Sequence, residues 1–161
     1  MVLQLKDKKG CIFCDFVNRN ALGHWIYEDR HVAGLLSLEG HPLIVPKPHF
    51  ADVFELDEIH AAAVMQAAVR VAKATKIATQ CDGINLVQSN GATAGQELFH
   101  IHLHIKPRFQ HDDVTMSWDA RAIDDEIRTK TSAAITQQLD KFPYRRIAPD
   151  PQLTPSTRSS S

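Results

Sequence analysis

The stretch that decides the fold runs from Gly95 to Pro107 and reads Gly95-Gln96-Glu97-Leu98-Phe99-His100-Ile101-His102-Leu103-His104-Ile105-Lys106-Pro107. Leu98 and three histidines fall on one parity, and four large apolar residues fall on the other. Alternation with a period of two over residues 98–105 predicts a β-strand with one face in the core. We therefore expect the apolar parity to face the core. The opposite face should carry three imidazoles in a row, with neighbouring Cα atoms about 6–7 Å apart.

A row of imidazoles on a strand suits two kinds of chemistry. Neighbouring histidines can bind one metal ion, or a neutral imidazole can attack an electrophile while its neighbours hold the developing charge. The preceding segment, residues 89–96, is small, polar and contains two glycines. Backbone N–H groups in such a loop can approach phosphate oxygens closely. The combination favours phosphoryl or nucleotidyl transfer, and a hydrolase with His100, His102 and His104 as ligands of a catalytic metal is the alternative.

Length and composition set the broad class. A chain of 161 residues with 43% hydrophobic residues predicts one domain with a sizeable core, which we expect over residues 1–140, followed by an irregular tail over 141–161. The net charge of −1 gives no indication of a nucleic-acid or membrane partner. No apolar run is long enough to span a bilayer, and the N-terminal segment lacks the residue order of a secretory signal. We expect a cytoplasmic protein.

The remaining elements follow from local patterns. A short helix is expected over 11–20, with Ile12, Phe13 and Phe16 turned inward. A long helix should begin after the N-cap Asp57, and its small-residue stripe predicts close packing against a sheet or a partner helix. The stripe comprises Ala63, Ala67, Ala74 and Ala78. The other expected elements are strands at 25–28, 32–38, 41–46 (Leu43 and Val45 on one face) and 84–88, and a second helix at 120–139 with Ile123, Ile127, Ala134 and Leu139 on one stripe.

The segment His100-Ile101-His102-Leu103-His104-Ile105-Lys106 resembles the histidine-triad motif His-φ-His-φ-His-φ-φ, in which φ is apolar. Lys106 departs from the motif at its last apolar position. The loop before it and the segment from Gly40-His41 to Pro46-Lys47-Pro48-His49 are also similar to that family, so the resemblance covers roughly residues 11–108. The histidine-triad (HIT) resemblance implies an α+β fold with a five-stranded antiparallel sheet, one long helix and a C-terminal helix. It also implies a homodimer whose two sheets join into a continuous one.

The resemblance further implies a catalytic scheme. His102 would attack the α-phosphorus of a nucleotide and form a nucleotidyl-histidine that water then cleaves. His104 would bind phosphoryl oxygens or assist the leaving group, while Gln96, Gly95 and Asn90 would hold the phosphate. His100 would either ligate zinc or orient its neighbour. Because only one ring nitrogen of His102 can attack, we expect the other to donate its proton to a backbone carbonyl.

The nucleoside pocket is also assigned through the resemblance. A purine is favoured, and the expected lining comprises Ile12, Phe13, Phe16, Leu36, Ser37 and Leu38. Ser37 stands where the family usually has an aspartate that binds the ribose hydroxyls, and the following loop is several residues shorter. Either Ser37 or Glu39 is left to replace that aspartate.

Cys11 and Cys14 have the spacing of metal ligands. One pair cannot complete a tetrahedral zinc site, so two more ligands are needed. Some bacterial members of the family bind structural zinc with two N-terminal cysteines, a histidine of the Pro-Lys-x-His segment and the first triad histidine. In this chain the resemblance therefore implies zinc on Cys11, Cys14, His49 and His100, with no organic cofactor.

The segment from His104 to Arg108 is similar to the His-x-x-Pro-Arg of relatives that hydrolyse dinucleoside polyphosphates. This similarity favours dinucleoside polyphosphate hydrolysis. Nucleoside phosphoramidate hydrolysis is the alternative, and so is a nucleotide-binding regulatory protein with weak activity.

Overall fold

The computed structural model describes residues 9–115, 122–139 and 141–142. The chain divides into two compact units, residues 1–114 and 115–161, and each is described here by itself. Residues 143–161 of the expected tail lie outside the described residues. The proposed domain boundary at residue 140 stays a prediction.

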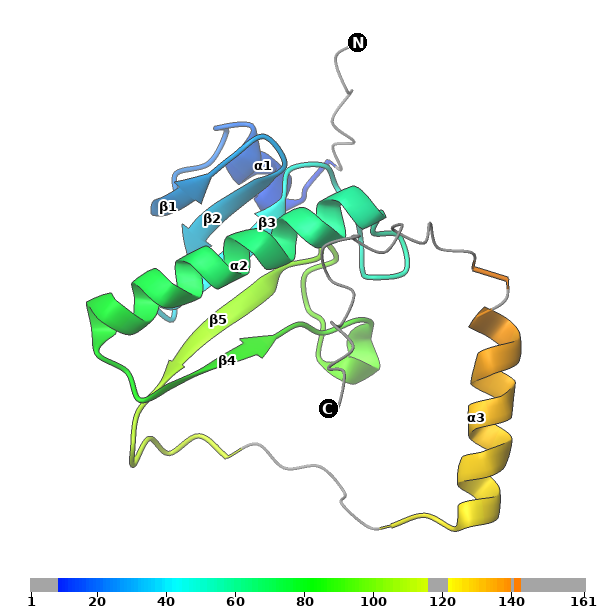
Figure 1. The fold of residues 1–161 in the computed structure, drawn as a ribbon. Coiled ribbons are helices and arrows are strands. Elements are labelled where there is room, and N and C mark those ends of the chain that lie inside the picture. Colours follow the sequence, from blue (N-terminus) through cyan, green and yellow to red (C-terminus); the bar gives the residue numbers. More distant parts are fainter. Residues whose placement is uncertain (1–8, 116–121, 140, 143–161) are drawn as a thin grey trace, which may run out of the picture. The chain divides into compact units, whose positions relative to one another are not determined.

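The first unit is built on a five-stranded antiparallel sheet with the strand order β1-β2-β3-β5-β4 (Figure 1). The predicted sheet is thus confirmed. Its outer strands are β1 and β4, and the triad strand β5 lies between β3 and β4. The strands are β1 (Trp25–Glu28), β2 (Val32–Leu36), β3 (Pro42–Pro46), β4 (Gly83–Val87) and β5 (Leu103–Arg108).

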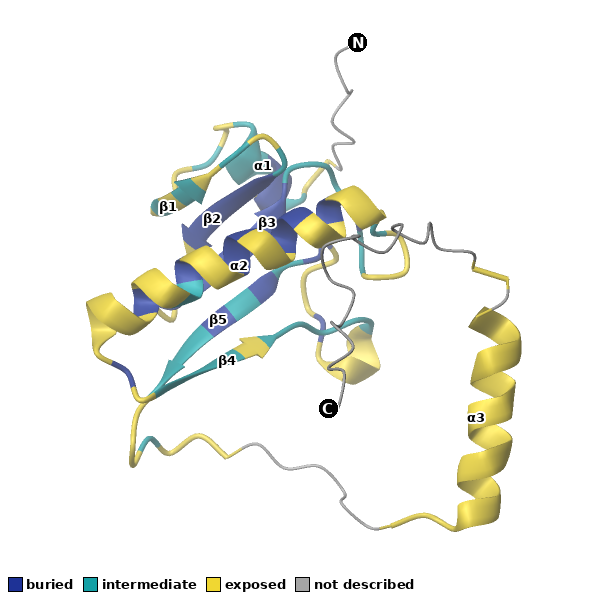
Figure 2. Cartoon of the chain, in the orientation of Figure 1, coloured by how far each residue is buried: buried dark blue, intermediate teal, exposed yellow. Residues whose placement is uncertain are grey.

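The long helix α2 (Glu58–Thr79) covers one face of this sheet. The Asp57 side chain caps it by accepting a hydrogen bond from the backbone N–H of His60, as predicted. Figure 2 shows buried residues along the side of α2 that faces the strands. The small-residue stripe is only half used, because Ala63 and Ala67 are buried against the sheet whereas Ala74 and Ala78 are exposed. The core on this face comprises Val32, Ile44, Ala63, Val64, Ala67, Ala68, Val71, Leu103 and Ile105.

The opposite face of the sheet is partly covered by the short helix α1 (Ile12–Val17). Phe13 packs there with Leu35, Leu43 and Val45, which confirms that Leu43 and Val45 share a face. Phe16 is partly buried in the same cluster. The inward orientation expected for Ile12 is wrong. Ile12 is the first residue of α1, and its side chain is exposed.

The triad strand is shorter than its sequence pattern predicts. β5 begins at Leu103, so His100 and His102 precede it rather than lie on it. Ile101 and Ile105 are buried as expected, but Phe99 is 45% exposed, and His100 is fully buried instead of facing outward. The cause is that pairing with β3 starts only at Leu103, and the backbone N–H of Ile101 donates to the carbonyl of Phe50, outside the sheet.

Three further boundaries differ from expectation by two residues or more. α1 ends at Val17 rather than at residue 20, with Asn18 as its C-cap. β2 ends at Leu36 rather than at residue 38, because the chain turns at Ser37, whose carbonyl accepts from the N–H of Gly40. In the second unit, α3 (Asp125–Leu139) begins after a non-helical segment at 122–124, which contains Ile123 of the expected apolar stripe. The other stripe residues, Ile127, Ala134 and Leu139, lie on α3 and are exposed within that unit. Among the described helices, none is both long and apolar enough to cross a membrane.

Candidate active site

His102 presents one ring nitrogen to its own chain and one to the site. Its Nδ1 lies 2.8 Å from the carbonyl oxygen of His100. Because a carbonyl only accepts, Nδ1 carries the proton and Nε2 carries the lone pair. This contact confirms the expected donation to a backbone carbonyl. The Phe13 ring packs against that of His102, with centroids 4.9 Å apart, so the imidazole is held on the α1 face of the sheet.

His104 lies on the same face, because it pairs directly with Leu43 of the Phe13 cluster. Its Nδ1 is 2.8 Å from Nε2 of His41, and Nδ1 of His41 is 3.1 Å from Oγ of Ser37. Burial lowers the pKa of His104 to about 4, and burial also lowers the pKa of His41. Both rings are therefore neutral near pH 7, and each bond in this chain is made by one donor and one acceptor.

A neutral chain of this kind has two proton arrangements. If Ser37 donates to His41 and His41 donates to His104, then Nε2 of His104 carries a proton and faces the site as a donor. The opposite arrangement would present two imidazole lone pairs to the site, one from His102 and one from His104. An anionic phosphate needs donors, so the first arrangement suits a phosphate-binding site. Ser37 then fixes the proton of a ring two side chains away.

The loop before the triad is fastened from inside by Gln96. Its side chain is buried, with 4% exposure, and its Oε1 accepts from the N–H of Gly91 at 2.7 Å. Its Nε2 donates to the carbonyls of Ala51 and Leu98. Both amide protons are therefore used, so Gln96 shapes the loop rather than offering its side chain to a phosphate. Asn90 performs a similar task, since its Oδ1 accepts from the N–H of Val53.

Gly91 and Gly95 let this loop turn tightly. Their φ angles are +83° and +84°, in the region that side chains disfavour, and a Cβ at either position would point into open space. The backbone around them is therefore accessible to a ligand from outside. The N–H groups of Gly91 and Gly95 themselves donate within the loop, to the Gln96 side chain and to the carbonyl of Ala92.

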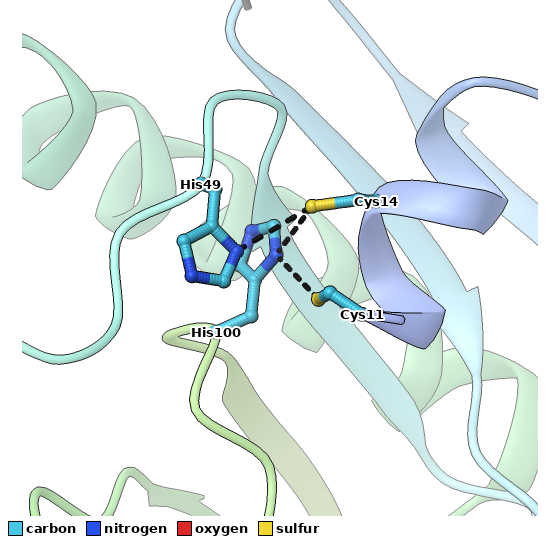
Figure 3. Close-up of side chains that lie close together, drawn as sticks. All are labelled: Cys11, Cys14, His49 and His100. Atoms are coloured by element: carbon cyan, nitrogen blue, oxygen red, sulfur yellow. Dashed lines mark hydrogen bonds between the residues drawn. The ribbon is translucent and has the colours of Figure 1, made fainter. Parts of the chain in front are cut away.

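A second cluster lies beside the triad and gathers all four of the expected metal ligands (Figure 3). The ring Nδ1 of His100 lies 3.4 Å from Sγ of Cys11 and 3.6 Å from Sγ of Cys14, and Nδ1 of His49 lies 3.4 Å from Sγ of Cys14. All four donor atoms lie within 4.8 Å of one another. The other nitrogen of His100 donates to the carbonyl of Pro46, which turns the Nδ1 lone pair towards the sulfurs. These residues can hold one metal ion.

His100 therefore has two separate tasks. Its ring belongs to the metal cluster, whereas its backbone carbonyl orients His102. The two interpretations offered by the sequence, ligand or orienting group, are compatible because they use different atoms. The ring itself is fully buried and does not face the site.

Comparison with known proteins agrees with this geometry. A HIT-domain family model matches residues 19–111, which is more than half of the chain. The chain belongs to the HIT family. One relative of this HIT protein, the "Protein hit" of Bacillus subtilis, is 34% identical over 109 residues, or 65% of this chain and 75% of the relative. Another, the adenosine 5'-monophosphoramidase HNT1 of Saccharomyces cerevisiae, is 32% identical over 119 residues, or 71% of this chain and 73% of the relative.

Two solved structures have the same fold as this HIT protein. A HIT-family protein from Bacillus subtilis superposes with a TM-score of 0.76 at 31% identity, covering 81% of this chain and 97% of that one. A zinc-bound histidine-triad protein from Mycobacterium smegmatis superposes with a TM-score of 0.63 at 32% identity, covering 83% of this chain and 98% of that one.

Part of the nucleoside pocket expected for this HIT protein does not assemble around the triad. Leu36 points to the α2 face, where it lines a hollow of about 250 Å³ with Val71 and Ala74. Leu38 is fully exposed in the turn after β2. Ser37 is bonded to His41. Of the expected lining residues, Phe13 is the one whose ring contacts the triad.

His41 contacts the triad but was not among the site residues expected from the sequence. It stands in the Gly40-His41 segment that already resembled the family, but it is 63 residues from its partner His104. A buried histidine next to a triad histidine could have been found by pairing the strand before Pro46 with the triad strand, because Leu43 and His104 are direct neighbours.

Proposed function

We propose that this HIT protein hydrolyses a nucleotide at its α-phosphate through a nucleotidyl-histidine intermediate on His102. The observation that carries the proposal is the hydrogen bond from Nδ1 of His102 to the carbonyl of His100, which leaves Nε2 as the nucleophile. The neighbouring His104 supplies a hydrogen bond to the phosphoryl oxygens, since its Nδ1 is held by His41. The loop from Gly91 to Gln96 is held in shape by its own hydrogen bonds, so a phosphate would gain its N–H groups only in exchange for bonds such as the one from Gly95 to the carbonyl of Ala92.

The reaction has two steps. Nε2 of His102 forms a bond to the α-phosphorus as the bond to the leaving group breaks, and the leaving group departs with the electron pair and takes a proton from solvent. Water then attacks the same phosphorus, the Nε2–P bond breaks, and a nucleoside monophosphate is released with loss of the water proton. Each step inverts the geometry at phosphorus, so the leaving group and then the attacking water must each lie across the phosphorus from Nε2 of His102.

Dinucleoside polyphosphates are our first substrate class, and phosphoramidates are the second. The support from Arg108 is weaker than its sequence context implied, because its guanidinium is engaged by Asp112, Asn85 and the carbonyl of Val114. The relative named as an adenosine 5'-monophosphoramidase favours a phosphoramidate. Release rates for AMP from diadenosine tetraphosphate and from adenosine 5'-phosphoramidate would rank the two classes directly.

We further propose that the metal cluster holds structural zinc. Tetrahedral zinc with about 2.3 Å to sulfur and about 2.05 Å to nitrogen places a sulfur and a nitrogen ligand about 3.6 Å apart. The three sulfur–nitrogen distances of 3.4–3.6 Å in the cluster fit that spacing. Zinc there would tie α1 to the segment that carries His100, and four protein ligands leave no position for a reacting water.

The test of the nucleophile is His102→Asn. This change keeps polarity and approximate size while removing the attacking nitrogen. We expect nucleotide binding within a few-fold of wild type and turnover lower by at least about a thousandfold, or roughly 4 kcal/mol of barrier. Wild-type protein quenched during turnover should carry an acid-labile, base-stable nucleotidyl group on His102. Substantial turnover by His102→Asn, or a label on His104, would show that the wrong histidine is assigned.

A further inference from the structure

β5 continues beyond the triad with two cationic residues on the active-site face. Lys106 and Arg108 follow His104 at intervals of two, and Lys106 stands where the triad pattern has an apolar residue. Lys106 pairs with Asn85 of β4, just as His104 pairs with Val87, so the two side chains point to the same side of the sheet. The row of imidazoles is therefore extended by positive charge.

Arg108 is fully engaged within the protein. Its guanidinium makes two hydrogen bonds to the Asp112 carboxylate, at 2.6 and 2.7 Å, one to Asn85 and one to the carbonyl of Val114. Arg108 also strongly lowers the pKa of Asp112. A ligand would have to break several of these bonds to reach the guanidinium, so Arg108 holds the end of β5 and does not bind substrate.

Lys106 is held far less firmly. Its Nζ lies 3.2 Å from Oε2 of Glu39, and the two side chains are 38% and 71% exposed. Glu39 lies in the turn between β2 and β3, and ion pairs between exposed side chains contribute little to stability because solvent screens them. An incoming anion can therefore take the place of the Glu39 carboxylate at little cost.

The ammonium group lies near the His41–His104 pair, because Oε2 of Glu39 contacts both Nζ of Lys106 and the His41 ring. His104 and Lys106 are consecutive residues on one face of β5, about 6–7 Å apart, and the proposed nucleophile His102 lies two residues before His104. Burial is the main cause of the lowered pKa of His41, and the charge of Lys106 is the next. For His104, burial and the charges of His102 and His41 lower the pKa more than Lys106 does. Glu39 approaches the same place, with its Oε2 3.4 Å from Nδ1 of His41.

We propose that Lys106 is a specificity-determining residue that binds a second anionic group of the nucleotide, and that Glu39 occupies its place in the free protein. The inference rests on the proposed function and adds the charge class of the substrate. The second anion can belong to the phosphate chain beyond the α-phosphate or to a phosphate on the sugar. A nucleotide with only an α-phosphate would not reach Lys106 and would leave the ion pair with Glu39 intact.

The test measures binding in the His102→Asn background, which prevents turnover. Dissociation constants for AMP, ADP and adenosine 3',5'-bisphosphate are determined by calorimetry without Mg²⁺, with and without the added change Lys106→Met. ADP adds its charge to the phosphate chain, and the bisphosphate adds it to the sugar. We expect Lys106→Met to raise the dissociation constant of one of these two ligands about tenfold more than that of AMP, which corresponds to ~1.4 kcal/mol. The affected ligand identifies the source of the anion.

Glu39→Gln should have the opposite effect on the affinity for the doubly phosphorylated ligand. It removes the competing carboxylate, so the same doubly phosphorylated ligand should bind about threefold more tightly relative to AMP. Lys73→Met is the matched control, since Lys73 is exposed on α2, which covers the other face of the sheet. This control should leave all the affinity ratios unchanged.

The outcomes separate this inference from the proposed function. If the nucleotides bind and Lys106→Met leaves both affinity ratios within twofold of the background, the inference is wrong and the proposed function stands. If Lys106→Met weakens the binding of all three nucleotides equally, Lys106 contributes only its charge to the electrostatic potential of the site, and the inference is also wrong. If no nucleotide binds even to wild-type protein, the proposed function fails and takes this inference with it.

Discussion

Ser37→Ala tests whether a serine sets the proton position on His104. The change removes the 3.1 Å contact to Nδ1 of His41, and the Glu39 carboxylate, 3.4 Å from that nitrogen, becomes its remaining partner. A carboxylate only accepts, so His41 must move its proton to Nδ1 and offer a lone pair to His104. His104 then carries its proton on Nδ1, which donates to His41, and its Nε2 no longer carries a proton that could be donated to a phosphate.

The magnitude follows from the loss of one hydrogen-bond donor to the developing charge. Such losses lower kcat by about 10²–10³, or roughly 2.7–4 kcal/mol of barrier. Because solvent can supply part of the missing bond, we expect the lower end, about a hundredfold in kcat, with KM changed less than threefold. The lost hydrogen bond at a buried histidine should also lower the free energy of unfolding by about 1–2 kcal/mol.

The assay is steady-state release of AMP, and Ser37→Thr is the matched control because it keeps the hydroxyl group. The ¹⁵N shifts of the imidazoles give an independent readout, since they report which nitrogen of His41 and His104 carries the proton. A Ser37→Ala protein with kcat within threefold of wild type would refute the reasoning. Unchanged His104 tautomer in that variant would refute it as well, whatever the activity.

Three further predictions concern the whole molecule. Protein purified without chelator should contain one zinc per chain, and removing the ion or introducing Cys14→Ser should cause slow loss of fold; a zinc-free, equally stable protein would exclude the structural ion. The free energy of unfolding should fall by about 1–2 kcal/mol as the pH is lowered from 6.5 to 4, on account of His104. The pKa of this ring is 6.5 in the unfolded chain and about 4 in the folded protein, so protonation in this range favours the unfolded chain. Urea titrations should show a smaller fall in His104→Gln, and an equal fall would contradict this assignment. Sedimentation should give about twice the 18.0 kDa chain mass, because β4 is an outer strand that a second sheet can extend, and a monomer at micromolar concentration would contradict it.

Much of the fold could be predicted because local signals and global packing agree. The 25–28 strand, the Asp57 cap and the shared face of Leu43 and Val45 are all confirmed. The alternation around the triad correctly predicted which residues are buried from Ile101 onward, but it could not locate the start of the strand. A strand begins where a partner is available, and the partner for β5 is provided by β3, more than 50 residues earlier.

The metal cluster could be predicted for a different reason. The spacing of Cys11 and Cys14 indicated two metal ligands, and the family resemblance supplied His49 and His100, which the structure brings together with them. The role of His102 also came from the resemblance and stays a prediction. The nucleoside pocket lacked a spacing of this kind. Apolar side chains such as Leu36 fit either face of a sheet, and only the observed register, in which Leu36 pairs with Pro42, assigns it to the α2 face.

The short turn after β2 places Ser37 beside His41, which in turn contacts His104. With Leu36 paired to Pro42, only residues 37–41 remain to reverse the chain, and the first and last of them are forced together. The backbone N–H of Ser37 donates to the carbonyl of His41, and that closure brings Oγ of Ser37 to the His41 ring. The length of the turn and the serine at its first position therefore act together, because the closure of the turn holds the Ser37 hydroxyl against the ring that contacts His104.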